Sequence, residues 1–259
     1  MAFLQVQFFS KALVVASTVW VVMPERDMGI GVKASEGPKE PPQVLYLLHG
    51  YSDDQSIWMR RTSVERYAAT HNLAVIMPAV NHSFYTNEAQ GERYWDYVAE
   101  ELPETMHAFL NLSDKPAETC VAGLSMGGYG AMKLALTHPD RFRCAGSFSG
   151  GVNMAGLVSR RPDTMERVFG DTSAIAGSEH DLFHLLKVNA KAPKKPKLYI
   201  SCGTEDFLWE DHLLFWPAAQ KAGWDVTHKE IPGFSHEWAL WDQEIKAFIE
   251  WAYGEEAKD

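Results

Sequence analysis

The stretch Gly123-Leu124-Ser125-Met126-Gly127 decides how the rest of this chain is arranged. The apolar residues before it, 118–122, predict a short buried strand, and residues 127–136 predict the first turns of a helix. A G-x-S-x-G pattern between a strand and a helix is typical of a nucleophile elbow, in which glycines permit a sharp turn. Such a turn exposes the Ser125 hydroxyl in a cleft and directs the Met126 N–H, at a helix N-terminus, toward a developing oxyanion. The alternative is a glycine-rich turn whose serine only caps the helix.

The composition is that of an ordinary globular protein with an acidic balance. The chain has 259 residues, of which 46% are hydrophobic and 22% are charged, and this size suits one large α/β domain. The formal net charge is −10. The one dense basic run, residues 191–197, predicts a solvated loop that leads into a strand. Because an acidic surface does not favour polyanions, we expect neither nucleic acid nor membrane as a partner.

Cysteine use and the N-terminal segment bear on the cellular compartment. Cys120, Cys144 and Cys202 each lie in or beside an apolar, strand-like run. An odd number of cysteines in apolar surroundings predicts buried free thiols and a reducing compartment. The apolar stretch 12–23 has no basic segment before it and no clean cleavage site after it, which favours a strand over a signal peptide. These features predict a cytoplasmic protein.

Strand and helix patterns alternate along the chain after an antiparallel start, which predicts a mostly parallel sheet with helices on both faces. Strands are expected at 3–9, 13–23, 43–48, 73–77, 118–122, 142–148, 197–202 and 225–230. Helices are expected at 62–70 (capped by Thr62), 94–112 (kinked or restarted at Pro103), 127–138, 211–222 (capped by Asp211) and 236–253. Residues 28–42 and 81–93 are expected to be loops at the surface. Residues 152–189 predict an insertion over the strand ends, within a single domain spanning 1–259.

Three polar residues follow predicted strands, at the edge where parallel sheets bind ligands. Ser125 and Asp206 each come after a strand, and His236 lies on the loop between the last strand and the last helix. A serine hydroxyl needs an imidazole to take its proton, and the imidazole needs a carboxylate to fix its tautomer. The chain order Ser, Asp, His is the one found in α/β-hydrolases. We therefore predict Ser125 as nucleophile, His236 as base and Asp206 as carboxylate, with His82 as the alternative base.

The second oxyanion donor is expected on the loop after residue 48. Gly50 lets the backbone approach a substrate closely, and the Tyr51 N–H is the predicted donor beside that of Met126. His49 stands at the strand end, where steering this loop is its expected task. Taken alone, His-Gly is equally compatible with a plain turn.

Together these segments resemble the esterase D-like branch of the α/β-hydrolases, and within it the bacterial tributyrin esterases and acetylesterases. The resemblance covers nearly the whole chain and rests on residues 47–52, 83–85, 101–103, 123–128, 203–206 and 236–238. It implies an α/β-hydrolase fold and hydrolysis of short-chain acyl esters, from acetyl to butyryl and including acetylated carbohydrates. It also implies an acyl-serine intermediate and no cofactor. The similar S-formylglutathione hydrolases carry a cysteine where this chain has Asp53, which argues against a glutathione thioester as substrate.

The residues that bind the substrate are less well determined by the sequence. Candidates for the walls of the acyl site are Gly50, Phe84, Tyr85, Trp238 and Trp241, although each aromatic residue is equally compatible with ordinary packing. S-formylglutathione hydrolase, feruloyl esterase and acyltransferase remain alternatives within the same family. A non-catalytic binding protein on a hydrolase fold is the alternative from another class. The expected partner is a small-molecule ester, and the resemblance also suggests a homo-oligomer.

Overall fold

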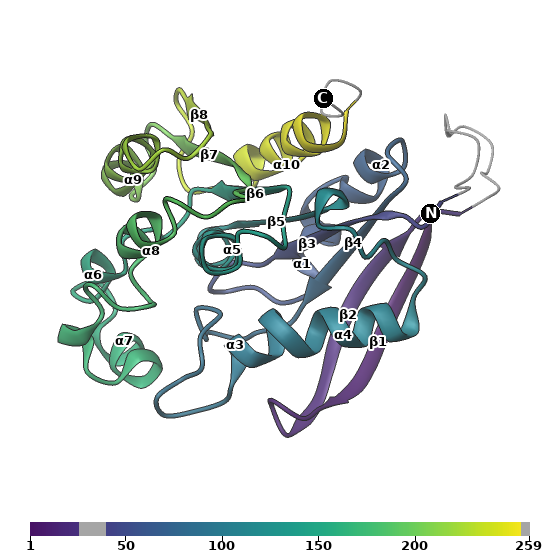
Figure 1. The fold of residues 1–259 in the computed structure, drawn as a ribbon, viewed down its shortest axis with the longest axis horizontal. Helices are drawn as coiled ribbons and strands as arrows, with labels where there is room; N and C mark the ends of the chain where they lie inside the picture. Colours follow the sequence, from purple (N-terminus) through teal and green to yellow (C-terminus); the bar gives the residue numbers. More distant parts are fainter. Residues whose placement is uncertain (26–39, 255–259) are drawn as a thin grey trace.

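An eight-stranded mixed sheet forms the centre of the fold in the computed structural model, which describes residues 1–25 and 40–254 (Figure 1). The strand order is β1-β2-β4-β3-β5-β6-β7-β8. The hairpin of β1 and β2 is antiparallel and β2 joins β4 antiparallel, whereas the other neighbours are parallel. The strands are β1 (Ala2–Ser10), β2 (Val15–Met23), β3 (Gln43–Leu48), β4 (Leu73–Pro78), β5 (Thr119–Leu124), β6 (Cys144–Phe148), β7 (Lys197–Gly203) and β8 (Val226–Ile231). The predicted α/β class is confirmed, while most of the predicted loop 28–42 lies outside the described residues.

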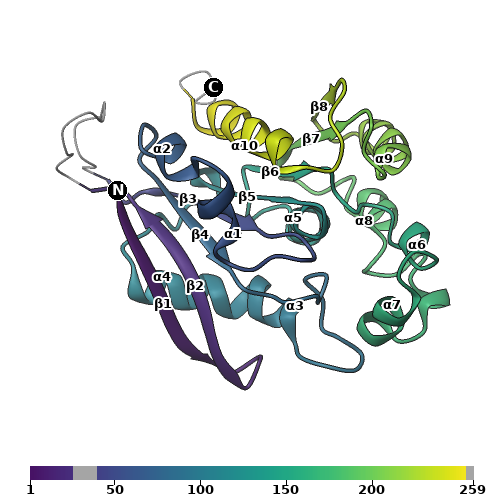
Figure 2. The same cartoon turned by 180° about the vertical axis from the view of Figure 1, so that it is seen from behind.

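Helices cover both faces of the sheet (Figures 1 and 2). One face carries α1 (Ile57–Arg61), α2 (Val64–Ala68) and α10 (Trp238–Tyr253). The other carries α3 (Tyr94–Asp96), a π-helical segment (Tyr97–Glu101), α4 (Leu102–Phe109), α5 (Met126–Thr137) and α9 (Trp209–Lys221). A short 3₁₀ turn, Pro116–Glu118, precedes β5. Within residues 1–25 and 40–254, no helix has both the length and the apolar composition needed to cross a membrane.

The central strand β3 shows why the sequence forms this layered arrangement. Val44, Tyr46 and Leu48 point into the core beneath α4 and α5, whereas Leu45 and Leu47 point into the core beneath α2 and α10. A strand covered on both faces needs apolar residues at every position, which explains its continuous apolar run. Burying each of these leucines stabilises the fold by about 1.5–3 kcal/mol.

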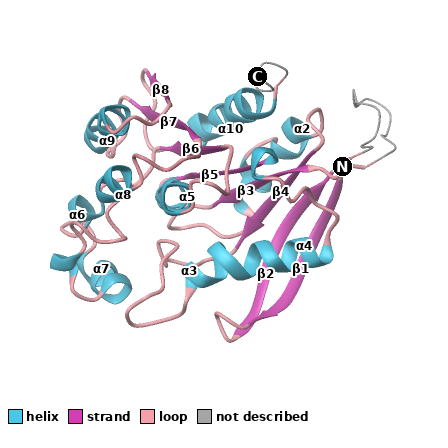
Figure 3. Ribbon diagram, viewed as in Figure 1, coloured by secondary structure: helices cyan, strands magenta, loops and turns pink. Residues whose placement is uncertain are grey.

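The predicted insertion, residues 152–189, consists of short helices beside α5. These are α6 (Met154–Leu157), α7 (Pro162–Phe169), a 3₁₀ turn (Thr172–Ala174) and α8 (Leu182–Val188). Figure 3 shows α6, α7 and α8 gathered on the side of α5 that faces away from the β1–β2 hairpin. That these short helices form an insertion within a single domain stays a prediction.

One predicted helix cap is wrong, another lies one residue from the expected position, and one helix was missed. Helix α1 precedes α2, and Ser63 rather than Thr62 occupies the position before α2. The Thr62 hydroxyl donates to the carbonyl of Trp58, so this residue ends α1, and it also accepts from the N–H of Val64, the first residue of α2, at 3.2 Å. Asp211 lies inside α9, which begins two residues earlier at Trp209. Helix α2 has only five residues, which is too few for a periodic pattern to indicate where it starts.

The prediction of three free thiols is wrong. Cys120 of β5 and Cys144 of β6 are directly opposite in the parallel register, with their Cα atoms 5.0 Å apart, and they form a disulfide. Cys202 on β7 is buried as a free thiol. The pairing depends on the register of two strands that are distant in sequence, which the residue pattern alone does not reveal. Cysteine content therefore no longer supports a reducing compartment.

Pro103 interrupts the helical run 94–109, as predicted, and a distant arginine compensates for it. Proline has no N–H to donate to the carbonyl one turn earlier, that of Ala99. The segment before it adopts π-helical geometry, and Arg141 donates to the Ala99 carbonyl at 2.8 Å. The same guanidinium binds both carboxylate oxygens of Glu100 at 2.9 and 3.2 Å. Arg141 therefore ties the turn after α5 to the interrupted helix.

We expect Arg141→Met to lower the free energy of unfolding by about 1–3 kcal/mol, because the carbonyl of buried Ala99 loses its donor. Urea unfolding of the wild type and the variant measures this difference. The exposed Arg66 of α2 gives a matched control, since Arg66→Met should change stability by less than about 0.5 kcal/mol. Equal effects of the two substitutions would contradict the role assigned to Arg141.

Candidate active site

Ser125 stands on a strained turn between β5 and α5. Its φ of 52° and ψ of −115° lie where side chains are rarely found. Its N–H donates to the carbonyl of Phe148 at 2.9 Å, and its carbonyl accepts from Gly151 at 3.0 Å. A Cβ on Gly127 would lie 2.4 Å from the Leu48 carbonyl oxygen. The glycine thus lets α5 pass close to the end of β3, and the neighbouring backbone holds the turn in its strained form.

The three residues of the predicted triad form a hydrogen-bonded chain with His236 in the middle. His236 Nε2 is 3.0 Å from Ser125 Oγ, and His236 Nδ1 is 2.8 Å from Asp206 Oδ2. The Asp206 side chain is fully buried, and its Oδ1 also accepts from the Leu208 N–H at 2.8 Å. Since a carboxylate only accepts, His236 holds its proton on Nδ1 and presents Nε2 as an acceptor. The serine hydroxyl therefore donates toward a base whose tautomer is already fixed.

A cavity of about 200 Å³ opens beside Ser125. Tyr51 and Met126, the predicted oxyanion donors, both line it. Met126 is the first residue of α5, so its N–H is one of the helix-terminal donors that have no acceptor within the helix. This end of the helix also favours negative charge through the helix dipole. The arrangement suits the stabilisation of an oxyanion on a carbon attached to Ser125.

His49 shapes the loop that carries Tyr51. Its Nε2 accepts from the Val80 N–H at 3.1 Å, so the ring proton must be on Nδ1, which donates to the Gly50 carbonyl at 2.7 Å. Its own carbonyl accepts from the Tyr85 hydroxyl at 2.9 Å. Burial lowers the pKa of His49 to about 4. The predicted steering role is confirmed, because a neutral imidazole with both nitrogens engaged anchors this turn.

Acidification is expected to remove the stability that neutral His49 provides. The pKa of His49 is 6.5 in the unfolded chain and about 4 in the folded protein. The unfolded chain therefore binds more protons than the folded protein between pH 4 and 6.5. The contribution is complete above pH 6.5 and is lost as the pH falls toward 4. Between pH 7.5 and 5.0 the loss should be about 2 kcal/mol.

Urea unfolding at these two pH values should show a smaller pH dependence for His49→Gln than for the wild type. His107→Gln, at an exposed position of α4, should leave the dependence unchanged. A His49→Gln protein with the full wild-type dependence would refute the assignment.

Four of the five predicted substrate-binding residues line the cavity, and one does not. Gly50, Phe84, Trp238 and Trp241 lie on its wall. Tyr85 is fully buried, and its ring packs against Gly130, where a Cβ would lie 2.5 Å away. Tyr85 therefore supports the loop 49–51 through its hydroxyl and does not line the cavity. The loop 81–93 is accordingly less exposed than predicted, because Phe84 and Tyr85 anchor it in the core.

Several lining residues were missed by the sequence analysis. Leu157 and Arg161 come from the insertion, and Phe207 and Leu208 follow Asp206. Asp53, which the sequence analysis named only as a difference from the S-formylglutathione hydrolases, also lines the cavity. The Arg161 guanidinium lies 4.3 Å from the ring centre of Tyr51. The Tyr51 ring also stacks on the ring of His82 at 4.2 Å. His82, the alternative base, is thus a packing partner of Tyr51. Phe207 and Leu208 could have been predicted to line the cavity because they follow Asp206 directly. Nothing in the sequence of the insertion indicated that Arg161 lines it.

Comparison with known proteins agrees with this geometry. The model of the esterase family, described as "Putative esterase", matches residues 22–251. The acetyl esterase of Caldicellulosiruptor saccharolyticus is 29% identical over 97% of this chain and 98% of its own length. The substrate-bound structure of FphF, a fluorophosphonate-binding serine hydrolase of Staphylococcus aureus, is 38% identical, with 96% and 97% of the two chains covered and a TM-score of 0.87. The S-formylglutathione hydrolase FrmB of S. aureus is also 38% identical, with 96% and 98% covered and a TM-score of 0.84.

The fold and the comparisons define a carboxylic ester hydrolase of the α/β-hydrolase fold. Since the family model spans most of the sequence, the chain belongs to this esterase family. The resemblance to esterase D-like hydrolases is confirmed.

Proposed function

We propose that this esterase hydrolyses short-chain acyl esters, from acetyl to butyryl, with Ser125, His236 and Asp206 as its catalytic triad. The observation that carries the proposal is the continuous chain of hydrogen bonds from Ser125 through His236 to Asp206, at 3.0 and 2.8 Å. A cavity of only about 200 Å³ beside Ser125 supports a small acyl group. The 29% identity to an acetyl esterase over 97% of the chain supports the same class.

The geometry suggests the following steps. Ser125 Oγ attacks the ester carbonyl carbon while His236 Nε2 takes the hydroxyl proton, and the carbonyl π electrons move to oxygen. The N–H groups of Tyr51 and Met126 hold this oxyanion. Collapse breaks the bond to the leaving alkoxide, which receives the proton from His236, and an acyl-serine remains. Water then repeats the sequence, releasing the carboxylic acid and restoring Ser125.

A screen of p-nitrophenyl esters of increasing acyl length, alongside acetylated oligosaccharides, tests the proposal. We expect kcat/KM to be highest for acetyl to butyryl groups and to fall for octanoyl and longer chains, which exceed the cavity. No turnover with any of these esters would overturn the proposal. Product analysis with added alcohols would show whether transfer to an alcohol competes with water.

Thioester hydrolysis is a second candidate, because one of the 38% identical structures is an S-formylglutathione hydrolase. Asp53 lines the cavity, and burial raises the pKa of its carboxyl group. Even with this raised pKa, the Asp53 side chain is an acidic group that lies beside the place where a substrate would bind. S-formylglutathione carries carboxylates of its own, so we expect its kcat/KM to be lower than that of p-nitrophenyl acetate. The reverse order would favour the thioester.

We further propose that the tip of the β1–β2 hairpin takes part in a homo-oligomer. Phe9, Val14 and Val15 are 63%, 73% and 54% exposed there, and Phe109 of α4, 60% exposed, lies beside Phe8. Exposed apolar side chains that cluster at a sheet edge favour a protein contact. Sedimentation should show a smaller particle for Val14→Asp than for the wild type, and an unchanged mass would contradict this surface.

The absence of nucleic-acid and membrane partners and the cellular location stay predictions. The net charge of −10 supports the expectation that neither nucleic acid nor membrane is a partner. The cytoplasmic location stays a prediction, and the disulfide removes the support that cysteine content gave it.

A further inference from the structure

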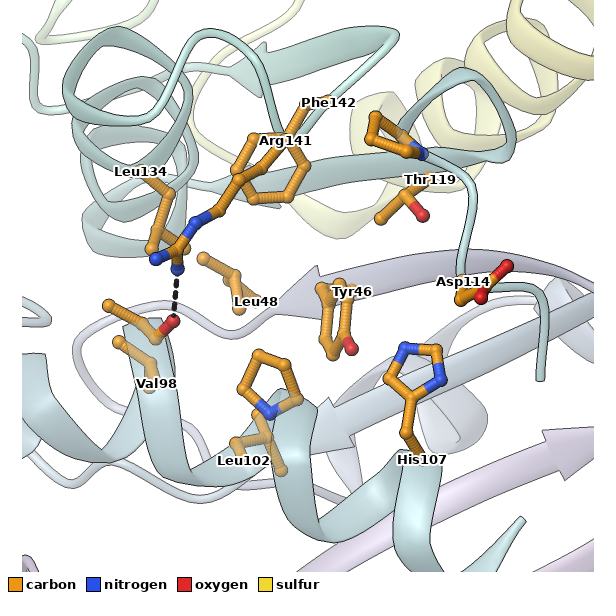
Figure 4. A pocket seen from close by; sticks show the side chains of 13 residues that line it. Tyr46, Leu48, Val98, Leu102, His107, Asp114, Thr119, Leu134, Arg141 and Phe142 are labelled. Atoms are coloured by element: carbon orange, nitrogen blue, oxygen red, sulfur yellow. Dashed lines mark hydrogen bonds between the residues drawn. The ribbon is translucent and has the colours of Figure 1, made fainter. Parts of the chain in front are cut away.

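A second cavity, of about 190 Å³, lies away from Ser125 (Figure 4). It lies between the interrupted helix 97–109 and the layer formed by β3, β5 and the end of α5. None of its lining residues lines the cavity beside Ser125. Leu134, on its wall, is nine residues along α5 from Ser125, which corresponds to about 13 Å of helix.

The walls of this cavity are apolar, and its depth holds one unpaired polar atom. Leu48, Leu102, Leu134 and Phe142 form much of the lining, and Figure 4 shows them around the ring of Tyr46. Tyr46 is 6% exposed, and its hydroxyl has no hydrogen-bond partner within residues 1–25 and 40–254. Buried hydroxyl groups in folded proteins are normally paired, so this cavity lacks a partner for Tyr46.

The charged residues at this cavity do not call for a charged ligand. The Arg141 guanidinium is already occupied by the Ala99 carbonyl and by Glu100, as Figure 4 shows for the first of these. His107 and Asp114 are exposed to solvent at the rim. A ligand that entered with a net charge would leave water without gaining a free buried partner, which is unfavourable.

The interrupted helix explains why this space exists. Pro103 and the π-helical segment before it hold the helix backbone in a widened turn, with Arg141 fixing the Ala99 carbonyl. Helical segments of this kind occur frequently at functional sites. An engineered apolar cavity of about 150 Å³ is known to hold benzene, so the volume here suits a ring with a small substituent.

We propose that this cavity binds a small uncharged phenol, with its ring among the apolar walls and its hydroxyl hydrogen-bonded to Tyr46. The phenol hydroxyl both donates and accepts, which satisfies the tyrosine hydroxyl in either role. Because the two cavities share no residue, such a ligand binds together with an ester and does not compete with it.

Protein-observed NMR with p-cresol as the probe tests this site on the full chain. We expect millimolar binding that shifts the signals of Leu48 and Leu134, while benzoate, with the same ring and a charge, does not bind there. Adding p-cresol should leave KM for p-nitrophenyl acetate unchanged. Shifts confined to residues around Ser125, or a soaked crystal showing only water at the Tyr46 hydroxyl, would overturn the proposal.

Variants separate a specific site from a simple packing gap. Tyr46→Phe removes a hydroxyl that has no partner, so the fold should be retained. It should weaken p-cresol binding about fivefold and leave toluene binding unchanged. Tyr67→Phe, which removes a hydroxyl bound to Asp242 on the other face, should change neither, and Val98→Phe should abolish both by filling the cavity. Equal affinity of the wild type and Tyr46→Phe for p-cresol would contradict the assigned hydrogen bond.

Discussion

Replacing Ser125 by alanine is expected to lower kcat for p-nitrophenyl acetate by about 10⁴-fold or more, with little change in KM. In the proposed mechanism this side chain supplies both the atom that attacks the ester and the proton that His236, at 3.0 Å, takes up. The cavity and the N–H groups of Tyr51 and Met126 remain in the variant, so binding persists and a small residual rate is left. Labelling by a fluorophosphonate should disappear together with turnover.

A second serine provides the control for this experiment. Ser159 lies exposed in the insertion, with its hydroxyl near the Gly156 carbonyl, and Ser159→Ala should retain wild-type kcat and labelling. Thermal unfolding of both variants should match the wild type within a few degrees. Loss of a nucleophile leaves a residual rate far below about 1% of wild-type kcat. If Ser125→Ala kept more than about 1% of wild-type kcat, Ser125 would not be the nucleophile.

Gly127→Ala is expected to cost about 3 kcal/mol or more of unfolding free energy, or to prevent folding. The added Cβ would lie 2.4 Å from the carbonyl oxygen of Leu48 and 2.7 Å from that of His49. Both are backbone atoms at the end of a buried strand, so relief requires moving β3 or α5. Any folded variant should also lose activity, because this shift displaces the loop that carries Tyr51.

Gly177 distinguishes steric crowding from backbone strain. Its φ is 77°, and an added Cβ would meet nothing within 4 Å. Gly177→Ala should therefore cost only about 1–2 kcal/mol, the strain of a left-handed alanine, and should leave turnover intact. Urea unfolding of the two variants measures the difference, and similar losses in both would show that close packing at Gly127 is not the cause.

The sheet was predictable from sequence because burial leaves a direct pattern. The unbroken apolar run of β3 and the alternation in β1 each follow from how many faces of the strand are covered. The disulfide and the short helix α1 were not predictable in this way. Cys120 and Cys144 meet only through the register of two strands, and α1 is too short to carry a periodic pattern of its own.

The proposed reacting groups follow from the sequence more directly than the walls around them. Ser125, Asp206 and His236 follow strands, and strand ends are brought together by the sheet itself. Phe84 and Tyr85 both adopt positive φ, at 50° and 51°. Phe84 lines the cavity, whereas the adjacent Tyr85 is buried in the core. Arg161 lines the cavity because of the way in which residues 152–189 fold. The sequence around Arg161 does not indicate this position.

The positions of the three proposed catalytic residues along the chain also set a sequence of events during synthesis. The elbow with Ser125 leaves the ribosome first, Asp206 follows after β7, and His236 arrives only after β8. A nascent chain can thus form the central strands and the strained turn while its serine still lacks a base. We expect such partial chains to be inert toward esters until His236 reaches the edge of the sheet, so that acylation begins only when the parallel sheet is complete.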